Sequence, residues 1–115
     1  MPKQFINLHV HSSFSLLDSC LKLEDLVARN KQLTEEFNQK YNENHETFSC
    51  VTDHGNLYAT MYHYNLCHSK NVNQIIGEEF YVTDDMTNKD AQHHKDYPNE
   101  HMIILAKNYD GYKQK

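Results

Sequence analysis

Short apolar segments alternate with helix-patterned and polar segments, and this alternation limits the possible fold more than any other feature. Apolar, partly β-branched runs, which predict strands, stand at residues 5–10, 48–52, 74–82 and 101–106. Apolar residues recur at helical spacing within 23–41, and residues 56–69 also have a helical pattern. Strands separated by helices indicate βαβ units with a parallel sheet. The sequence therefore predicts an α/β fold.

Length and composition limit the size of the core and the class of protein. The chain has 115 residues, enough for one small domain, and its 38% hydrophobic content and mean hydropathy of -0.85 predict a thin core. A net charge of -5 argues against a protein that holds nucleic acid through a basic face. We expect no membrane partner, because no apolar run approaches the roughly 20 residues of a membrane span.

The cysteines and the first residues indicate the compartment. The three cysteines are odd in number and show no CxxC spacing, so a reduced compartment is the simplest interpretation. The first ten residues lack the long apolar segment of a signal peptide. We therefore expect a cytoplasmic protein.

Candidate metal ligands follow three successive predicted strands. His9 and His11 stand two apart at the end of the first strand, so their side chains should point to the same side and could bind one metal ion. Asp18 lies in the following loop, the second strand runs into Asp53 and His54, and the third carries Glu78 and Glu79. A single His-x-His pair is more often incidental. Three such strand ends at one edge of a parallel sheet are hard to assign to packing.

The other histidines and the clustered tyrosines have simpler interpretations. His45, His63 and His68 are expected at the surface or on helix faces, and His93 and His94 in solvent within a polar loop. Tyrosines at 58, 62 and 64 fit amphipathic packing better than a base-stacking platform.

Several motifs together resemble a known family. The segments "LHVHSSFSLLDS", "VTDHGNLYATMYHY", "IIGEEFYV" and "HMIILAKNYDGYK" are similar to the PHP (polymerase and histidinol phosphatase) domain. The version they resemble stands at the N-terminus of bacterial DNA polymerase III alpha subunits, the family C polymerases. The resemblance implies a partial PHP-type (β/α) barrel made of the first few βα units with parallel strands. Residues 1–115 would be a single N-terminal portion of that domain, with 34–46 as an extended helix or insert and 83–100 as a polar loop.

The resemblance also assigns a set of ligands. The family's metal ligands fall on six residues, namely His9, His11, Asp18, His54, Glu79 and His101. Glu79 rather than Glu78 matches the family pattern, and Glu78 stands where a small residue is usual. His101 opens its predicted strand instead of closing it, so its place at the site rests on the resemblance alone.

The chemistry implied by the family is metal-assisted phosphoester hydrolysis. Two or three Zn²⁺ or Mn²⁺ ions would suit the mixed ligands. His9 and His11 would hold one ion, and Glu79 could bridge two. Asp53 and His54 are the implied catalytic residues, with Asp53 orienting His54 or a neighbouring ligand. In polymerases the domain is a 3′–5′ proofreading exonuclease or, where ligands are lost, a structural platform.

Three functions remain open at this point. The family's barrel contains further strands and ligands beyond those matched, so the resemblance implies a truncated domain with an open sheet. Such a sheet would need the remainder of the polymerase chain or a second copy. The chain could be a DNA polymerase III alpha-like piece acting on DNA or another phosphate ester, a stand-alone metal-binding module, or an inactive structural module.

Overall fold

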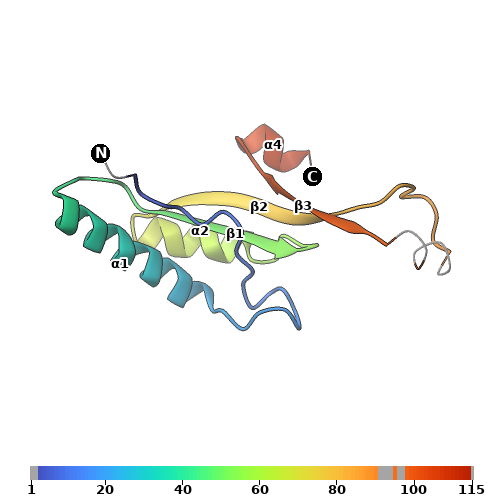
Figure 1. The fold of residues 1–115 in the computed structure, drawn as a ribbon, viewed down its shortest axis with the longest axis horizontal. Helices are drawn as coiled ribbons and strands as arrows, with labels where there is room; N and C mark the ends of the chain where they lie inside the picture. Colours follow the sequence, from blue (N-terminus) through green and yellow to red (C-terminus); the bar gives the residue numbers. More distant parts are fainter. Residues whose placement is uncertain (1–2, 91–94, 96–97, 115) are drawn as a thin grey trace.

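The computed structural model describes residues 3–90, 95 and 98–114. Their elements, in chain order, are α1 (Leu23–Tyr41), β1 (Phe48–His54), α2 (Thr60–Ser69), β2 (Asn73–Val82), β3 (Glu100–Leu105) and α4 (Tyr109–Lys113) (Figure 1). Within the described residues the strands form one sheet in the order β1-β2-β3. None of the described helices is long and apolar enough to cross a membrane. The predicted positions of His93 and His94 lie outside the described residues.

Helix α1 confirms the predicted range 23–41, and local chemistry explains both of its ends. Glu24 and Asp25 lie in the first turn, where negative charge favours the positive end of the helix dipole. The helix ends where Asn42 takes a left-handed conformation, with φ 52°, and donates its N–H to the Asn38 carbonyl. Helix α2 begins at Thr60, later than predicted, because the Asn56 side chain accepts the Tyr58 N–H and forms a turn first.

Both long helices pack on one face of the sheet, and the core lies between them and β1 (Figure 1). One core cluster contains Leu23, Leu26, Val51 and Ala59, and a smaller one contains Val27, Cys67 and Val72. The core is thin, as the composition predicts. Of the three free cysteines, Cys50 and Cys67 are buried and Cys20 is exposed.

His63 lies on a helix face, as expected, but on the face of α2 that packs against the sheet. Its side chain is fully buried, at 1% exposure. Its Nδ1 accepts from Gln74 Nε2 at 3.1 Å, so Nε2 must carry the proton that is donated to Ser49 Oγ at 2.9 Å. Burial lowers the pKa of His63 to about 4, despite the opposing effect of Asp53. His63 is therefore a neutral part of the core.

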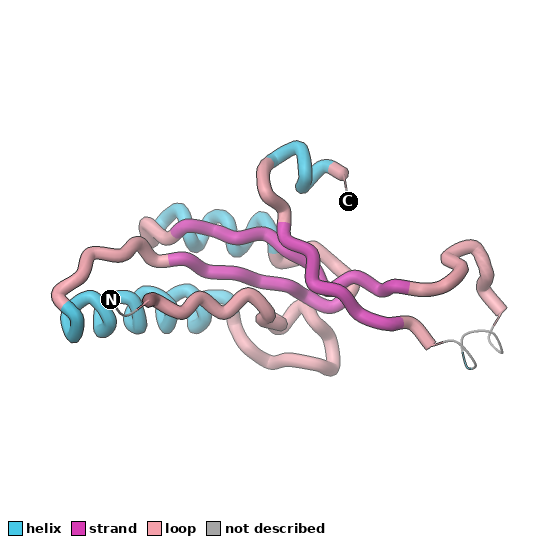
Figure 2. Tube along the Cα trace, turned by 45° about the horizontal axis from the view of Figure 1, so that its top comes forward, coloured by secondary structure: helices cyan, strands magenta, loops and turns pink. Residues whose placement is uncertain are grey.

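The sheet is mixed, which corrects the prediction of parallel strands throughout. Strands β1 and β2 are parallel, as predicted, but β3 runs antiparallel to β2. Strand β3 begins beside the end of β2, where Glu100 pairs with Val82, and a chain that re-enters a sheet at the edge where it left pairs antiparallel (Figure 2). The start of β3 therefore lies at the same sheet edge as the ends of β1 and β2.

The prediction of a strand at residues 5–10 is wrong. This segment runs beside β1 (Figure 2), and the Thr52 N–H donates to the Val10 carbonyl at 2.7 Å. The Val10 N–H, however, donates to Thr52 Oγ1 at 2.9 Å instead of to a strand carbonyl. A side chain thus replaces the backbone acceptor that a continuous ladder needs, and the segment follows β1 without becoming a strand.

Candidate metal centre

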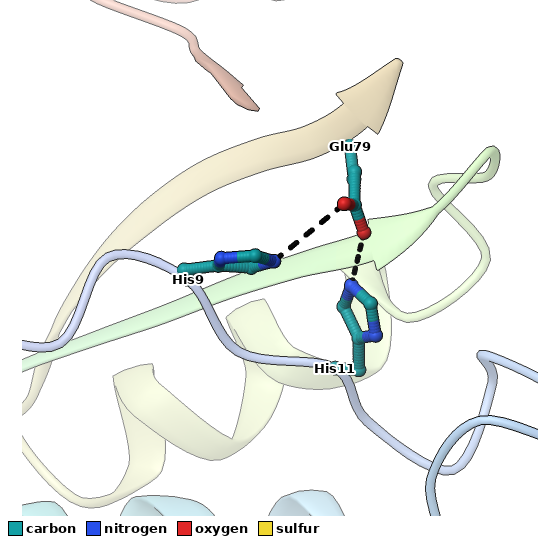
Figure 3. Close-up of side chains that lie close together, drawn as sticks. All are labelled: His9, His11 and Glu79. Carbon is teal, nitrogen blue, oxygen red and sulfur yellow. Dashed lines mark hydrogen bonds and ion pairs between the residues drawn. The ribbon is translucent and has the colours of Figure 1, made fainter. Parts of the chain in front are cut away.

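His9 and His11 converge on one carboxylate although their segment is not a strand. Val10 between them packs against the core cluster of Leu23 and Val51, so its two neighbours point to the opposite side. Figure 3 shows the two imidazoles, each turned toward a different oxygen of the Glu79 carboxylate. His9 Nε2 lies 3.7 Å from Glu79 Oε1, and His11 Nε2 is hydrogen-bonded to Glu79 Oε2.

His54 and His101 reach the same carboxylate from the strands. His54 is the last residue of β1 and pairs in register with Glu79, and its Nδ1 lies 3.3 Å from Glu79 Oε2. His101 pairs with Tyr81, two residues beyond Glu79 and therefore on the same face of β2. Its Nδ1 lies 3.9 Å from Glu79 Oε1. The antiparallel direction of β3 explains how a histidine at a strand start reaches this edge.

These contacts define two groups of ligand-type side chains. The first cluster is His9, His11 and Glu79, and the second cluster is His54, Glu79 and His101. Within each cluster the candidate ligand atoms all lie within 4.8 Å of one another. Each oxygen of Glu79 faces one histidine of each cluster, so this carboxylate belongs to both.

The surroundings of Glu79 favour its charged form. Burial alone would raise the pKa of this carboxyl, whose side chain is 10% exposed. The hydrogen bond with His11 and the positive charge of His11, His9 and His54 outweigh burial and lower the pKa of Glu79. The carboxylate can therefore act as a ligand at neutral pH.

The donor set fits a divalent transition metal. Four imidazoles and one shared carboxylate are ligands that suit Zn²⁺ or Mn²⁺. In addition, His54 Nδ1 is buried and makes no hydrogen bond within the part of the chain that the structure describes, although Glu79 lies near it. A buried ring nitrogen without a hydrogen bond destabilises a protein core, but in a metal site the same nitrogen can bind the ion.

Asp53 fastens the loop after His11 to the end of β1. Its buried carboxylate accepts the Ser12 N–H at 2.6 Å, the Ser12 hydroxyl at 2.7 Å and the Ser15 hydroxyl at 2.9 Å. Ser15 Oγ in turn accepts the His54 N–H at 2.9 Å. Asp53 therefore bonds the residue after His11 directly and reaches the His54 N–H through the Ser15 hydroxyl, an arrangement suited to orienting ligands.

Asp18 and Glu78 lie apart from the two clusters. Asp18 is exposed, its backbone N–H donates to the Ser15 carbonyl at 3.1 Å, and neither cluster includes it. Its role as a ligand stays a prediction. Glu78 alternates with Glu79 along β2 and pairs in register with Asp53, so it lies on the opposite face of the sheet from Glu79.

Ser12, Ser15 and Tyr81 contact the site but were not predicted from the sequence. The serines directly follow the His-x-His pair, and small hydroxyl side chains there are suited to bonding a carboxylate from the next strand. Tyr81 stands two residues after Glu79, and strand alternation alone places it on the ligand face. Its ring contacts the rings of His54 and His101.

Comparison with known proteins agrees with this geometry. The family model for the PHP domain matches residues 7–114. DNA polymerase III subunit alpha of Treponema pallidum is 34% identical over 109 residues, which cover 95% of this chain and 8% of that protein. The subunit of Borreliella burgdorferi is 36% identical over 110 residues, covering 96% and 9%, and that of Thermus aquaticus 35% over 112 residues, covering 96% and 8%.

Two facts follow from these matches. The chain spans less than a tenth of the length of these relatives. The family match nonetheless covers nearly all of the chain, including both strands that end at the clusters and the strand that begins there. With its unclosed α/β sheet, this chain belongs to the PHP domain family.

Proposed function

We propose that this chain holds a divalent-metal centre of the phosphoesterase type. The observation that carries the proposal is the position of Glu79, whose two oxygens each face a histidine from both clusters. His9 and His11 would hold one ion and His54 and His101 a second, with Glu79 shared between them. Asp18 is a further candidate ligand from the exposed loop after His11.

The reaction we propose is hydrolysis of a phosphodiester. When bound, Zn²⁺ or Mn²⁺ would supply a Lewis acid for phosphate and a water of lowered pKa. The chain's own residues would fix the ligands. Asp53 holds the Ser12–Ser15 turn against β1. The Val10 side chain packs in the core and so keeps His9 and His11 turned toward Glu79.

The substrate and partners are inferred from the relatives. Because these are DNA polymerase III alpha subunits, we propose DNA as the substrate, 3′–5′ exonuclease-type cleavage, and a cytoplasmic role in DNA replication. We also propose that the remainder of a polymerase chain or a second copy packs on the sheet. The exposed apolar side chains Met102 and Ile104 on β3 support such packing. The alternative is a metal-binding or structural module without catalysis.

Metal binding is the first test of this proposal. We expect the purified chain, loaded with Zn²⁺ or Mn²⁺ at neutral pH and desalted, to retain metal by elemental analysis. The double variant His9→Ala, His11→Ala should lose the first cluster, because the imidazoles that remain near Glu79, those of His54 and His101, belong to the second cluster. His68→Ala, a histidine exposed on α2, is the matched control. Metal at background level in the loaded wild-type chain would contradict the proposal.

Hydrolysis distinguishes the two candidate functions. Release of nucleotides from single-stranded DNA that depends on Mn²⁺ or Zn²⁺, and that is lost with a chelator and in the double variant, would support a phosphodiesterase. Metal binding without such release, in the chain alone and with added polymerase fragments, would support the module.

A further inference from the structure

Three aromatic rings meet at the second cluster, and only two of them are histidines. The Tyr81 ring centroid lies 4.8 Å from that of His54, at 59°, and 5.4 Å from that of His101, at 65°. The His54 and His101 rings lie 4.5 Å apart at 82°. Tyr81 therefore packs against both imidazoles of the second cluster, tilted against His54 and edge-on to His101.

The first cluster has a different surrounding. His9 and His11 contact each other at 5.3 Å, and His11 lies 5.9 Å from His54. Among the described residues, the ring contacts of His9 and His11 are with histidines only. The tyrosine ring thus distinguishes the second cluster from the first.

The turn after β1 leaves the space that Tyr81 occupies. Gly55 has φ +71°, and a Cβ added to it would lie 2.6 Å from Tyr81 Cε2 and 3.4 Å from Cζ. The Gly55 N–H donates to the Glu79 carbonyl at 3.0 Å, which ties this glycine to the strand that carries Tyr81. A side chain at this position would displace the ring, and it would also strain the backbone.

We propose that Tyr81 is a positioning residue of the second cluster. Rotation of an imidazole about its last side-chain bond is only weakly restricted, and the His101 side chain is 45% exposed. The Tyr81 ring limits this rotation and keeps Nδ1 of His54 and Nδ1 of His101 turned toward Glu79. The contacts are made by the ring, so phenylalanine should replace tyrosine. The expected effect of Tyr81 on metal affinity rests on the proposed function above.

Zinc titration of the full chain tests the effect on ligands. We expect Tyr81→Ala to lower the Zn²⁺ affinity of one of two sites by about 10-fold, because residues outside the ligand set change metal affinity by about 10- to 100-fold. The affinity of the other site should change by less than about 2-fold. Tyr81→Phe should retain wild-type affinity at both, and Gly55→Ala should reproduce the selective loss. Tyr64→Ala is the matched control, because Tyr64 stacks on His68 on the exposed side of α2. Equal loss at both sites, unchanged affinity in Tyr81→Ala, or loss in Tyr81→Phe would overturn the inference.

Imidazole NMR of the metal-free chain supplies an independent readout. Tyr81→Ala should shift the ring signals of His54 and His101, because a neighbouring aromatic ring is lost, while the His9 signals stay in place. Single His→Gln variants assign the signals. If the wild-type chain binds no Zn²⁺, the proposed function fails. The NMR result then decides the positioning role, and unchanged His54 and His101 signals would overturn it.

Discussion

Histidines on the two faces of the sheet have opposite surroundings. On the helix-covered face, His63 is buried and both of its ring nitrogens bond to neutral side chains, Ser49 and Gln74. On the other face, four histidines remain partly exposed and all face Glu79. The difference teaches that an excess of histidines does not identify ligands. The partners of each ring nitrogen do, because the His63 nitrogens are held by neutral core side chains, whereas each histidine of the two clusters turns a ring nitrogen toward the Glu79 carboxylate.

The largest effect should come from the one residue that both clusters share. Glu79→Gln keeps the shape of the side chain but removes its charge. We expect Zn²⁺ affinity to fall more than about 100-fold at each cluster, because outer residues alone contribute about 10- to 100-fold. Calorimetric titration measures this change. Glu36→Gln, at an exposed position of α1, is the control. A loss confined to one cluster would show that Glu79 does not join the two.

The buried histidine, His63, should affect the stability of the fold in acid and leave metal affinity unchanged. The pKa of His63 is about 4 when folded and 6.5 in its ordinary state, so the unfolded chain takes up the proton first as pH falls. The contribution of neutral, buried His63 to the free energy of unfolding is complete above pH 6.5 and is lost as the pH falls from 6.5 to about 4. The loss should reach about 3 kcal/mol, at about 1.4 kcal/mol per pH unit. Urea unfolding of the metal-free chain at a series of pH values measures it.

A paired variant separates this effect from other titrations. His63→Gln should remove the decline in this window, whereas His68→Gln, at an exposed position of the same helix, should retain it. The lowered pKa of Glu79 affects stability only at lower pH. Its contribution to the free energy of unfolding is present above the ordinary carboxyl pKa of 4.5 and is lost as the pH falls below that value. The same decline in wild type and His63→Gln would contradict the assignment.

A smaller effect is expected at Asp53, which links the two faces. It lies two residues after Val51 on β1 and so on the same, helix-covered face, yet its carboxylate holds the loop beside His11. Asp53→Asn removes the charge and one acceptor, so the free energy of unfolding should fall by about 2 kcal/mol. Asp110→Asn, which breaks the exposed pair with Lys113, should cost well under 1 kcal/mol. Urea unfolding at pH 7 compares them, and equal effects would rule out a special role for the buried carboxylate.

The sequence by itself determined the features that depend on local spacing. The apolar stripe of 23–41 predicts α1 with its observed bounds, because helical periodicity places Leu23, Leu26 and Val27 on one face. The two-residue spacing of His9 and His11 predicts their convergence even though no strand forms there, since the side chains of an extended backbone alternate in any case. Strand alternation places Glu78 and Glu79 on opposite faces, and the resemblance to the PHP pattern selects Glu79.

Tertiary structure decided the features that depend on pairing between distant segments. The direction of β3 follows from how the chain returns after β2, and it alone explains the arrival of His101 beside Glu79. The failure of residues 5–10 to form a strand depends on the hydroxyl of Thr52, some 40 residues away. The contacts of Asp53 with Ser12 and of Tyr81 with His54 likewise join separate segments. Local periodicity carries no information on such contacts, because they form only when the sheet brings those segments together.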